Sequence, residues 1–201
     1  MVEPVQGRGA SKPPPPRPES LDVRQRARRD RIVQATVRLM VHTDYESLQM
    51  KDITIEAGVA LGTTYRYFNS KEHLVAEALL AWARQFGREV AAPEGRTVDR
   101  VKIAYRRAAR AFELNPSVYG HMLAVQGSSD PRAVEIFDLF ASGRLDAFAT
   151  YLARVPSPRR ERIIAVMSAV LGENLRSWSL GRQSIESVYA SLDSAADLLL
   201  G

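Results

Sequence analysis

Residues 58–71 of the chain read GVALGTTYRYFNSK. Gly58 separates two short runs of helical spacing, Met50–Ala57 and Leu61–Phe68. A glycine accepts the left-handed backbone conformation that a sharp break between two helices requires. Two short helices joined in this way have the spacing of a helix-turn-helix, whose second helix enters the major groove of DNA.

The second short helix carries side chains suited to a nucleic-acid backbone. Gly62 would let the start of the helix approach DNA closely, because it has no side chain. Thr63 and Tyr67 are expected to point their hydroxyls, one helical turn apart, toward phosphate oxygens. Lys71 adds a cation at the start of the next helix. The residue types therefore favour DNA binding over an ordinary pair of core helices.

Composition excludes several classes of chemistry. The 201 residues carry a formal net charge of +5, which favours an anionic partner, although excess arginine is often only a solvated surface. The chain has no cysteine and only three scattered histidines, so we expect no metal site and no cofactor. No catalytic triad, phosphate loop or paired acid and base is present, so we expect no catalytic residue and no enzyme.

The chain shows no apolar run of the roughly 18 residues that span a membrane, and its N-terminus lacks the apolar block of a secretory signal. We therefore expect a cytoplasmic protein without a membrane partner. Residues 1–19 are basic and rich in proline, and they are predicted to be disordered. They form either an arm along DNA or, as we favour, an unstructured leader.

Beyond the tail, apolar residues recur at spacings of three and four, which predicts an all-α fold of about nine helices. We expect a three-helix helix-turn-helix domain over residues 20–70 and a larger helical effector-binding and dimerisation domain over 71–201. Ser70 can cap the first helix of this larger domain. The helices expected in it are Lys71 to about Val90, Asp99–Leu114, Ser117–Val125, Arg132–Ala153, Pro158–Leu180 and Ser184–Leu200.

The first helix of the chain is predicted between Ser20, a possible cap, and Asp44, which tolerates the conformation of a helix end. Its apolar positions predict a buried face of Val23, Ala27, Ile32 or Val33, Thr36 and Met40. Arginines cover the other faces, and we expect a solvated surface for most of them: Arg24, Arg28, Arg29 and Arg31.

The segment from Arg31 to Leu74 resembles the DNA-binding domain of TetR-family transcriptional regulators, most closely in G-x-x-x-G-T-x-Y-R-Y-F-x-S-K at residues 58–71. The resemblance implies phosphate contacts at Thr63, Tyr67 and Lys71 and groove contacts at Lys51, Leu61, Gly62 and Tyr65. Gln49 and Arg66 complete the set of candidate DNA-binding residues. This sequence departs from the family pattern at Ala60 and Gln49, where capping residues are usual, and at Thr64, where leucine is usually buried.

The same resemblance implies that the larger domain binds an effector and forms a two-fold dimer. Residues 163–171 are apolar almost all round, as expected of a helix buried between its own core and a partner subunit. The alternative is that the last two helices are core helices within one chain. The candidate dimer-interface residues are Ile164, Leu171, Ile185, Val188, Leu192, Ala196 and Leu199.

Large or polar-tipped residues on the middle helices are candidates to line an effector cavity, although such residues are more often plain core. They are Tyr105, Phe112, Tyr119, Met122, Phe137, Phe140, Phe148, Met167, Asn174 and Trp178. Their mostly apolar character predicts an apolar or amphipathic small-molecule effector.

A narrower similarity, carried by Y-E-S-L-Q-M at residues 45–50, V-A-L-G-T at 59–63, Asn115-Pro116 and L-x-x-W at 175–178, is to actinobacterial TetR-type repressors of cholesterol and steroid breakdown. It implies a steroid or a fatty acyl-CoA thioester as effector. Phosphates of such a thioester would need cations at the pocket mouth, for which the candidates are Arg106, Arg107, Arg110, Arg159, Arg160 and Arg162.

These observations predict a homodimeric repressor that binds a palindromic operator in double-stranded DNA and is released by its effector. The alternatives are an activator of the same fold and a DNA-organising helix-turn-helix protein without a lipid effector.

Overall fold

The computed structural model describes residues 15–87 and 94–201, and over these ranges the chain is all-α, as predicted, with no strand. After a short 3-10 turn at Pro18–Ser20, nine α-helices follow in the described residues. They are α1 (Val23–Met40), α2 (Met50–Ala57), α3 (Leu61–Tyr67), α4 (Lys71–Gly87), α5 (Thr97–Leu114), α6 (Pro116–Gln126), α7 (Pro131–Tyr151), α8 (Ser157–Ser179) and α9 (Ile185–Leu200). The predicted bounds are confirmed to within a few residues from α2 onward, except that Val90 and most of the predicted tail lie outside the described residues.

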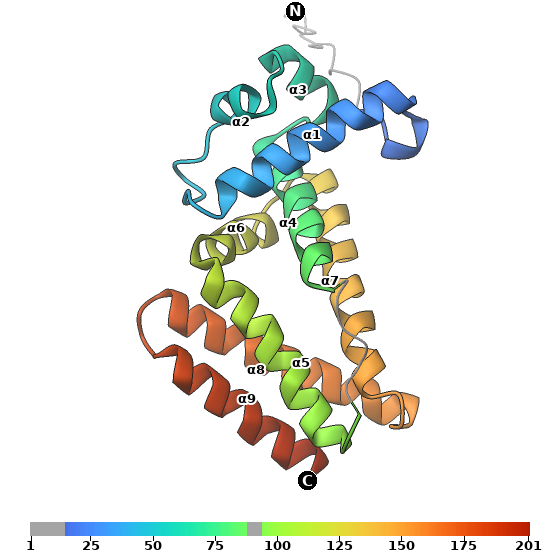
Figure 1. The fold of residues 1–201 in the computed structure, drawn as a ribbon, viewed down its shortest axis with the longest axis vertical. Coiled ribbons are helices and arrows are strands. Elements are labelled where there is room, and N and C mark those ends of the chain that lie inside the picture. The colour runs from blue at the N-terminus through green and yellow to red at the C-terminus, as the bar shows by residue number, and fades with distance from the viewer. Residues whose placement is uncertain (1–14, 88–93) are drawn as a thin grey trace, which may run out of the picture.

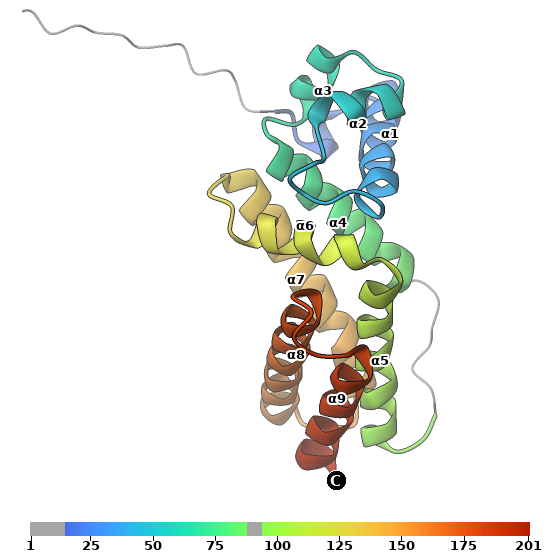
Figure 2. The ribbon, with the colours of Figure 1, turned by 90° about the vertical axis from the view of Figure 1, so that its left-hand side faces the viewer.

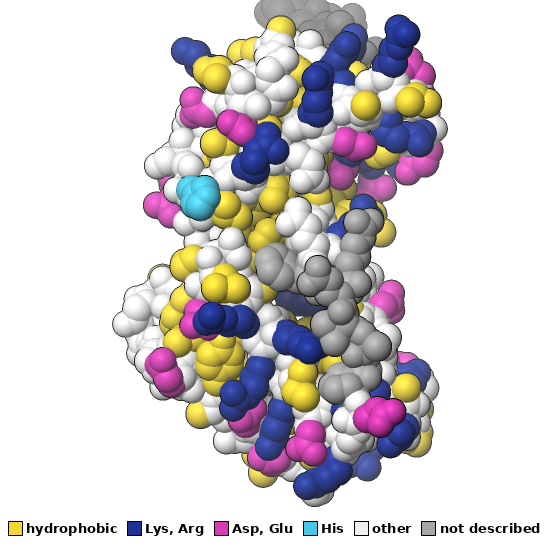
Figure 3. Space-filling view, viewed as in Figure 1, with side chains coloured by type: hydrophobic (Ala, Val, Ile, Leu, Met, Phe, Trp, Pro, Cys, Tyr) yellow, Lys and Arg dark blue, Asp and Glu magenta, His cyan; other side chains and the backbone are white. Residues whose placement is uncertain are grey.

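The molecule is elongated, with α1, α2 and α3 at one end and α8, α9 and the C-terminus at the other (Figure 1). We call α1–α3 the head and α5–α9 the body. Helix α4 belongs to both, because it packs against α1 in the head and against α6 and α7 in the body. Figure 2 shows the same arrangement from the side, and Figure 3 shows the two parts as separate lobes with basic side chains spread over both.

The first helix differs from its prediction at both ends. Asp22, not Ser20, caps α1, since its carboxylate accepts from the backbone N–H of Gln25 at 2.8 Å in a capping box. The helix ends at Met40 rather than Asp44. Val23, 83% exposed, and Ala27 do not belong to the buried face, because the N-terminal end of α1 reaches past α4 (Figure 1). From Ile32 onward the predicted face is confirmed.

A buried ion pair joins α1 to α4. Arg29, predicted to lie on a solvated face, is only 6% exposed, and its Nη2 donates to a carboxylate oxygen of Glu77. The guanidinium carbon also lies 5.2 Å from the centre of the Phe68 ring. Because a buried charge without a partner is costly, the pairing of Arg29 with Glu77 favours one arrangement of α4 against the head.

In the body, polar bonds hold α5 against α9 along one edge. Arg106 Nε donates to Asp193 at 2.8 Å, and Lys102 Nζ donates to Asp197 at 2.8 Å. Tyr119 of α6 donates its hydroxyl to the carbonyl of Gly172 in α8 at 2.9 Å. Apolar side chains from the head, from α4 and from the body form one continuous core. The body is therefore built around the same core that supports the head.

Candidate nucleic-acid interface and effector cavity

The turn between α2 and α3 has the conformation that its glycine predicts. Gly58 has a φ of 63° and a ψ of 43°, in the left-handed region. Its N–H donates to the Ile55 carbonyl at 3.1 Å, and the Val59 N–H donates to the Thr54 carbonyl at 3.0 Å. No atom of the described residues lies within 4 Å of where a Cβ would stand, so backbone conformation rather than crowding requires glycine here.

Most predicted DNA-contact residues lie on the outer surface of α2 and α3, which we call the reading face. Leu61 is 43% exposed, and Thr63 and Tyr65 are partly buried. The remaining members of the reading face are all exposed: Gln49, Lys51, Gly62 and Arg66. Both helices lie at the free end of the head, away from the body (Figure 1). The reading face is therefore accessible to a duplex.

Two of the predicted phosphate contacts are placed differently. Tyr67 is 1% exposed, so its ring belongs to the core, and its hydroxyl accepts from Arg66 Nη2 at 3.2 Å. Lys71 is turned toward the loop before α2: its Nζ lies 3.9 Å from the centre of the Tyr45 ring and donates to the Tyr45 carbonyl. Burial lowers the pKa of Lys71. The expectation that the Tyr67 hydroxyl projects outward is wrong, and Arg66 presents the exposed polar group instead.

The helix starts that lack family capping residues also lack caps in the structure. Gln49 before α2 and Ala60 before α3 make no side-chain cap hydrogen bond. Thr64 is fully buried, and its Oγ1 has no hydrogen-bond partner within the described part of the chain. An unpaired buried hydroxyl costs about 1–3 kcal/mol, so α3 is held by packing on α1 and α2 rather than by its own polar groups.

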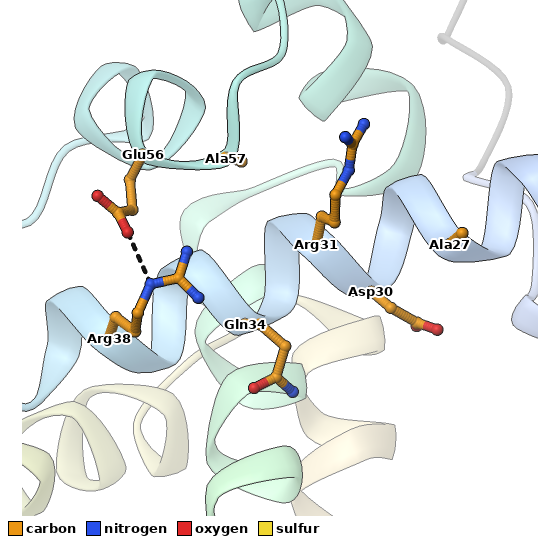
Figure 4. A pocket seen from close by; sticks show the side chains of 7 residues that line it. All are labelled: Ala27, Asp30, Arg31, Gln34, Arg38, Glu56 and Ala57. Carbon is orange, nitrogen blue, oxygen red and sulfur yellow. Dashed lines mark hydrogen bonds and ion pairs between the residues drawn. The ribbon is translucent and has the colours of Figure 1, made fainter.

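A shallow hollow of about 300 Å³ lies between α1 and α2. Figure 4 shows Arg38 of α1 and Glu56 of α2 pointing toward one another across it, with Nε to carboxylate oxygen at 2.6 Å. Its other lining residues are largely polar or charged: Ala27, Asp30, Arg31, Gln34 and Ala57. The ion pair across the hollow therefore braces α1 against α2.

Gly62 and Gly58 give a paired prediction. A Cβ at Gly62 would meet no atom within 4 Å in the described part of the chain, and the φ of Gly62 is not positive. Gly62→Ala is therefore expected to leave stability unchanged or to raise it by up to about 1 kcal/mol. If Gly62 contacts DNA, the same change weakens binding roughly tenfold. Gly58→Ala is expected to destabilise by about 1–2 kcal/mol, because it strains the turn. Urea unfolding and duplex binding of both variants provide the measurement, and unchanged affinity in Gly62→Ala would remove that residue from the interface.

A cluster of hydrogen bonds ties the head to the start of α7; we call Asn69, Ser70 and Asp130 the latch. The Ser70 hydroxyl donates to Asp130 Oδ2 at 2.5 Å, and Asn69 Nδ2 donates to the same oxygen at 3.0 Å. The other carboxylate oxygen caps α7 by accepting from the N–H of Arg132 at 2.8 Å. Burial alone raises the pKa of Asp130, but the Ser70 and backbone hydrogen bonds outweigh it and lower the pKa below its usual value.

His73, next to the latch, makes stability depend on pH. Burial and the Arg132 charge, with a smaller contribution from Arg29, lower its pKa to about 4, against the opposing charges of Asp130 and Glu135. In the unfolded chain His73 therefore binds a proton near pH 6.5, whereas in the folded chain it binds one only near pH 4. The contribution of His73 to the free energy of unfolding is fully present above about pH 6.5 and is lost as the pH falls toward 4. This loss amounts to about 3 kcal/mol.

Urea unfolding between pH 7.5 and 4.5 measures this loss. We expect His73→Gln to make the profile less steep than that of the unchanged protein. Equal slopes for His73→Gln and the unchanged protein would contradict the assignment.

The body contains a cavity of about 660 Å³ bounded by α4, α5 and α7. Three predicted effector-binding residues line it: Phe112, Phe140 and Phe148. Seven do not, and for these the prediction is corrected: Tyr105, Tyr119, Met122, Phe137, Met167, Asn174 and Trp178. Tyr105 stacks on Phe148 with 4.0 Å between ring centres, so it supports the wall from behind. Helical spacing marks inward-facing residues but does not separate a cavity wall from a packed core.

Other residues of this cavity were not singled out from the sequence. Trp82 and Leu80 of α4 line one side, and Arg144 of α7 lies among the phenylalanines. Of the arginines proposed for thioester phosphates, Arg107 lines the cavity. Arg106 and Arg110 are instead paired with Asp193 and Glu113, and Arg159 donates to the carbonyl of Leu199. A lone arginine on the apolar side of α7 was the signal that sequence analysis missed.

The candidate dimer residues also need correction. Five of the seven are at most 5% exposed and pack within the chain's own core: Ile164, Leu171, Val188, Leu192 and Ala196. Ile185 and Leu199 are partly buried. The outward side of α8 carries Ala165, Val166 and Ala169 instead, and the outward side of α9 carries Ala190, Ser194 and Leu198. The apolar stripes predicted from the sequence therefore pack α8 and α9 against the rest of the body.

Two further searches covered residues 15–87 and 94–201. No group of three or more histidine, aspartate and glutamate side chains is placed to hold a metal ion there. None of the helices in these ranges has the length and apolar character needed to cross a membrane.

Comparison with known proteins places this geometry in a family. Residues 32–78 match the family described as bacterial regulatory proteins, tetR family. The chain is 33% identical to the HTH-type transcriptional repressor KstR of Mycobacterium tuberculosis, over 88% of this chain and 82% of that protein. A TetR transcriptional regulator from Rhodococcus sp. RHA1 is 27% identical, with a TM-score of 0.72 over 89% of this chain and 97% of that one. FadR from Bacillus subtilis, solved in complex with stearoyl-CoA, shares the fold at 15% identity, with a TM-score of 0.60 over 86% of this chain and 97% of that one.

The match extends through both head and body, and the family consists of regulators rather than enzymes. The exposed reading face, the left-handed glycine turn and the helical body all agree with it. The chain therefore belongs to the tetR family of bacterial regulatory proteins and is a DNA-binding transcriptional repressor, not an enzyme.

Proposed function

We propose that the protein acts in the cytoplasm as a homodimer that represses transcription from a palindromic operator and leaves the DNA when an effector fills the body cavity. The observation that carries this proposal is the spatial order of three features along one chain. The reading face lies at one end, the apolar cavity lies in the body, and the latch connects the helix that lines the cavity to the head.

On the reading face, the exposed Lys51 is suited to the acceptor atoms of guanine, and Leu61 and Tyr65 offer apolar edges to thymine methyl groups. Thr63 and Arg66 offer donors to phosphates, and Gly62 leaves room for the backbone. The Lys71 ammonium would have to leave Tyr45 to reach a phosphate, so its role requires a rearrangement of that loop.

Dimerisation is expected because one reading face can contact only half of a palindromic operator. A single recognition helix reads only a half-site, and two copies related by a two-fold axis read both halves of a palindrome. The outward sides of α8 and α9 suit this contact, because their small side chains let helices approach closely and Val166 and Leu198 are exposed. We assign the dimer interface to these faces.

The effector class follows from the cavity lining. Aromatic and aliphatic side chains dominate it, and its volume of about 660 Å³ suits a lipid-sized molecule. Similarity to KstR and the shared fold with the stearoyl-CoA complex of FadR support an apolar or amphipathic effector, such as a steroid or a fatty acyl derivative.

Coupling between the cavity and the head runs through α4 and α7. Both helices line the cavity, α4 continues from the head, and the latch bonds the start of α7 to the turn before α4. A ligand that binds better when α4 and α7 are apart would shift the two heads of a dimer away from the operator spacing. It releases DNA only to the extent of its preference for that state.

Selection of duplexes from a random library tests the function. We expect one palindromic motif with half-sites about one helical turn apart, bound by whole dimers. An asymmetric or absent motif would contradict the proposal and favour a DNA-organising protein. Reporter expression that falls when the gene is deleted would indicate an activator.

A further inference from the structure

Arg144 of α7 is a partly buried cation for which the described residues supply no hydrogen-bond acceptor or counter-charge. It lines the body cavity, its Nε is inaccessible to solvent, and no hydrogen bond or ion pair reaches it from any residue within 15–87 or 94–201. Its guanidinium carbon lies 5.6 Å from the centre of the Phe140 ring. Burial lowers the pKa of Arg144, with only the Tyr105 and Tyr119 hydroxyl groups acting in the opposite direction.

Among the described residues, the cavity lining holds no acidic side chain that could compensate this charge. Its described lining contains three arginines, Arg84, Arg107 and Arg144, and no aspartate or glutamate. Arg84 and Arg107 are exposed, and the Arg107 Nη1 donates to the hydroxyl of Tyr151 at 3.5 Å. Desolvating a guanidinium without a counter-charge costs several kcal/mol, so the described residues leave this site ready for an anion.

We propose that the effector is an apolar acid whose carboxylate is bound by Arg144 inside the cavity. Its hydrocarbon part would lie among Phe112, Phe140 and Phe148. A guanidinium presents two parallel N–H donors that match the two oxygens of a carboxylate. The same pairing in an apolar surrounding is stronger than in water. This inference rests on the proposed function and narrows it from an apolar or amphipathic ligand to one that carries a carboxylate.

The position of Arg144 separates this ligand from one recognised by its phosphates. Phosphate groups are strongly hydrated and suit the exposed Arg84 and Arg107, whereas Arg144 lies deeper and beside an aromatic ring. A carboxylate at the end of a hydrocarbon chain or ring system can enter the cavity together with that hydrocarbon. The free acid and its CoA thioester are therefore expected to depend on different arginines.

The experiment compares a long-chain fatty acid and a steroid acid with their methyl esters and CoA thioesters, by thermal shift and calorimetry on the full chain. Arg144→Met removes the charge but keeps a long side chain. Arg144→Lys keeps the charge but removes the two parallel N–H donors of the guanidinium. Arg107→Met is the matched control. We expect at least one acid to bind and its ester not to bind. Arg144→Met should lower the affinity for that acid about tenfold or more, and Arg144→Lys should lower it by a smaller factor. Arg107→Met should lower it less than about threefold.

The ligand-free variants provide a second readout. Because its guanidinium is uncompensated, Arg144→Met is expected to melt at the same temperature as the unchanged protein or higher. Three results would overturn the inference: a large drop in that melting temperature, equal binding of acid and ester, or binding of no acid. Loss of acid binding in Arg107→Met but not in Arg144→Met would also overturn it. Operator binding without ligand, measured on the same samples, tests the proposed function separately, since Arg144→Met should leave it unchanged.

Discussion

Replacing Glu77 with alanine is expected to destabilise the protein by about 3–5 kcal/mol, the largest stability effect that we predict. The change leaves the Arg29 guanidinium buried between α1 and α4 without its carboxylate, in a place that is only 6% exposed. An uncompensated buried charge costs far more than the loss of one hydrogen bond. Urea unfolding at pH 7.5 measures the change.

The exposed pair Arg38–Glu56 supplies the matched control, since its side chains are 57% and 38% exposed. Glu56→Ala is expected to cost less than about 1 kcal/mol. The double variant Arg29→Met with Glu77→Met should recover most of the stability lost in Glu77→Ala, because both charges leave together. A Glu77→Ala effect as small as that of Glu56→Ala would contradict the structural role of the pair.

Replacing Val166 with glutamate is expected to abolish dimerisation and to weaken operator binding by roughly a hundredfold or more. Val166 is 46% exposed on the outward side of α8, so the isolated chain can accommodate the carboxylate. In the proposed dimer the same carboxylate would be buried between subunits without a partner. Sedimentation velocity and duplex binding measure the two effects.

Leu145→Glu is the control for this prediction. Leu145 is an apolar residue of α7 that is 39% exposed and lies outside the proposed interface, so its change should leave dimerisation and operator binding intact. A Val166→Glu protein that remains dimeric and binds the operator normally would remove α8 from the interface.

The sequence predicted best those parts of the molecule where one residue type meets one local requirement. Gly58 marked the left-handed turn, and breakers such as Pro116 and the Ser70 cap marked the limits of helices. The reading face was also recognisable, because polar and small residues at the start of a short helix have few structural uses. These signals are local in the chain and do not depend on what packs against them.

Features that depend on long-range packing could not be predicted. The ion pair of Arg29 joins residues far apart in sequence, and nothing in α1 alone distinguishes Arg29 from its solvated neighbours. Tyr67 has the hydroxyl of a phosphate ligand but the position of a core residue. The apolar stripes of α8 and α9 indicated burial correctly, yet periodicity is the same for burial against one's own core and against a partner.

The proposed function requires that a ligand in the body cavity controls DNA binding by the head. Its most direct test is an equilibrium titration of a fluorescent selected operator with the protein, with and without the compound that most raises the melting temperature. We expect this compound to lower operator affinity at least tenfold in the unchanged protein and to have a much smaller effect at the same concentration in Arg144→Met. An operator affinity that is unaffected by saturating amounts of every stabilising compound would contradict it.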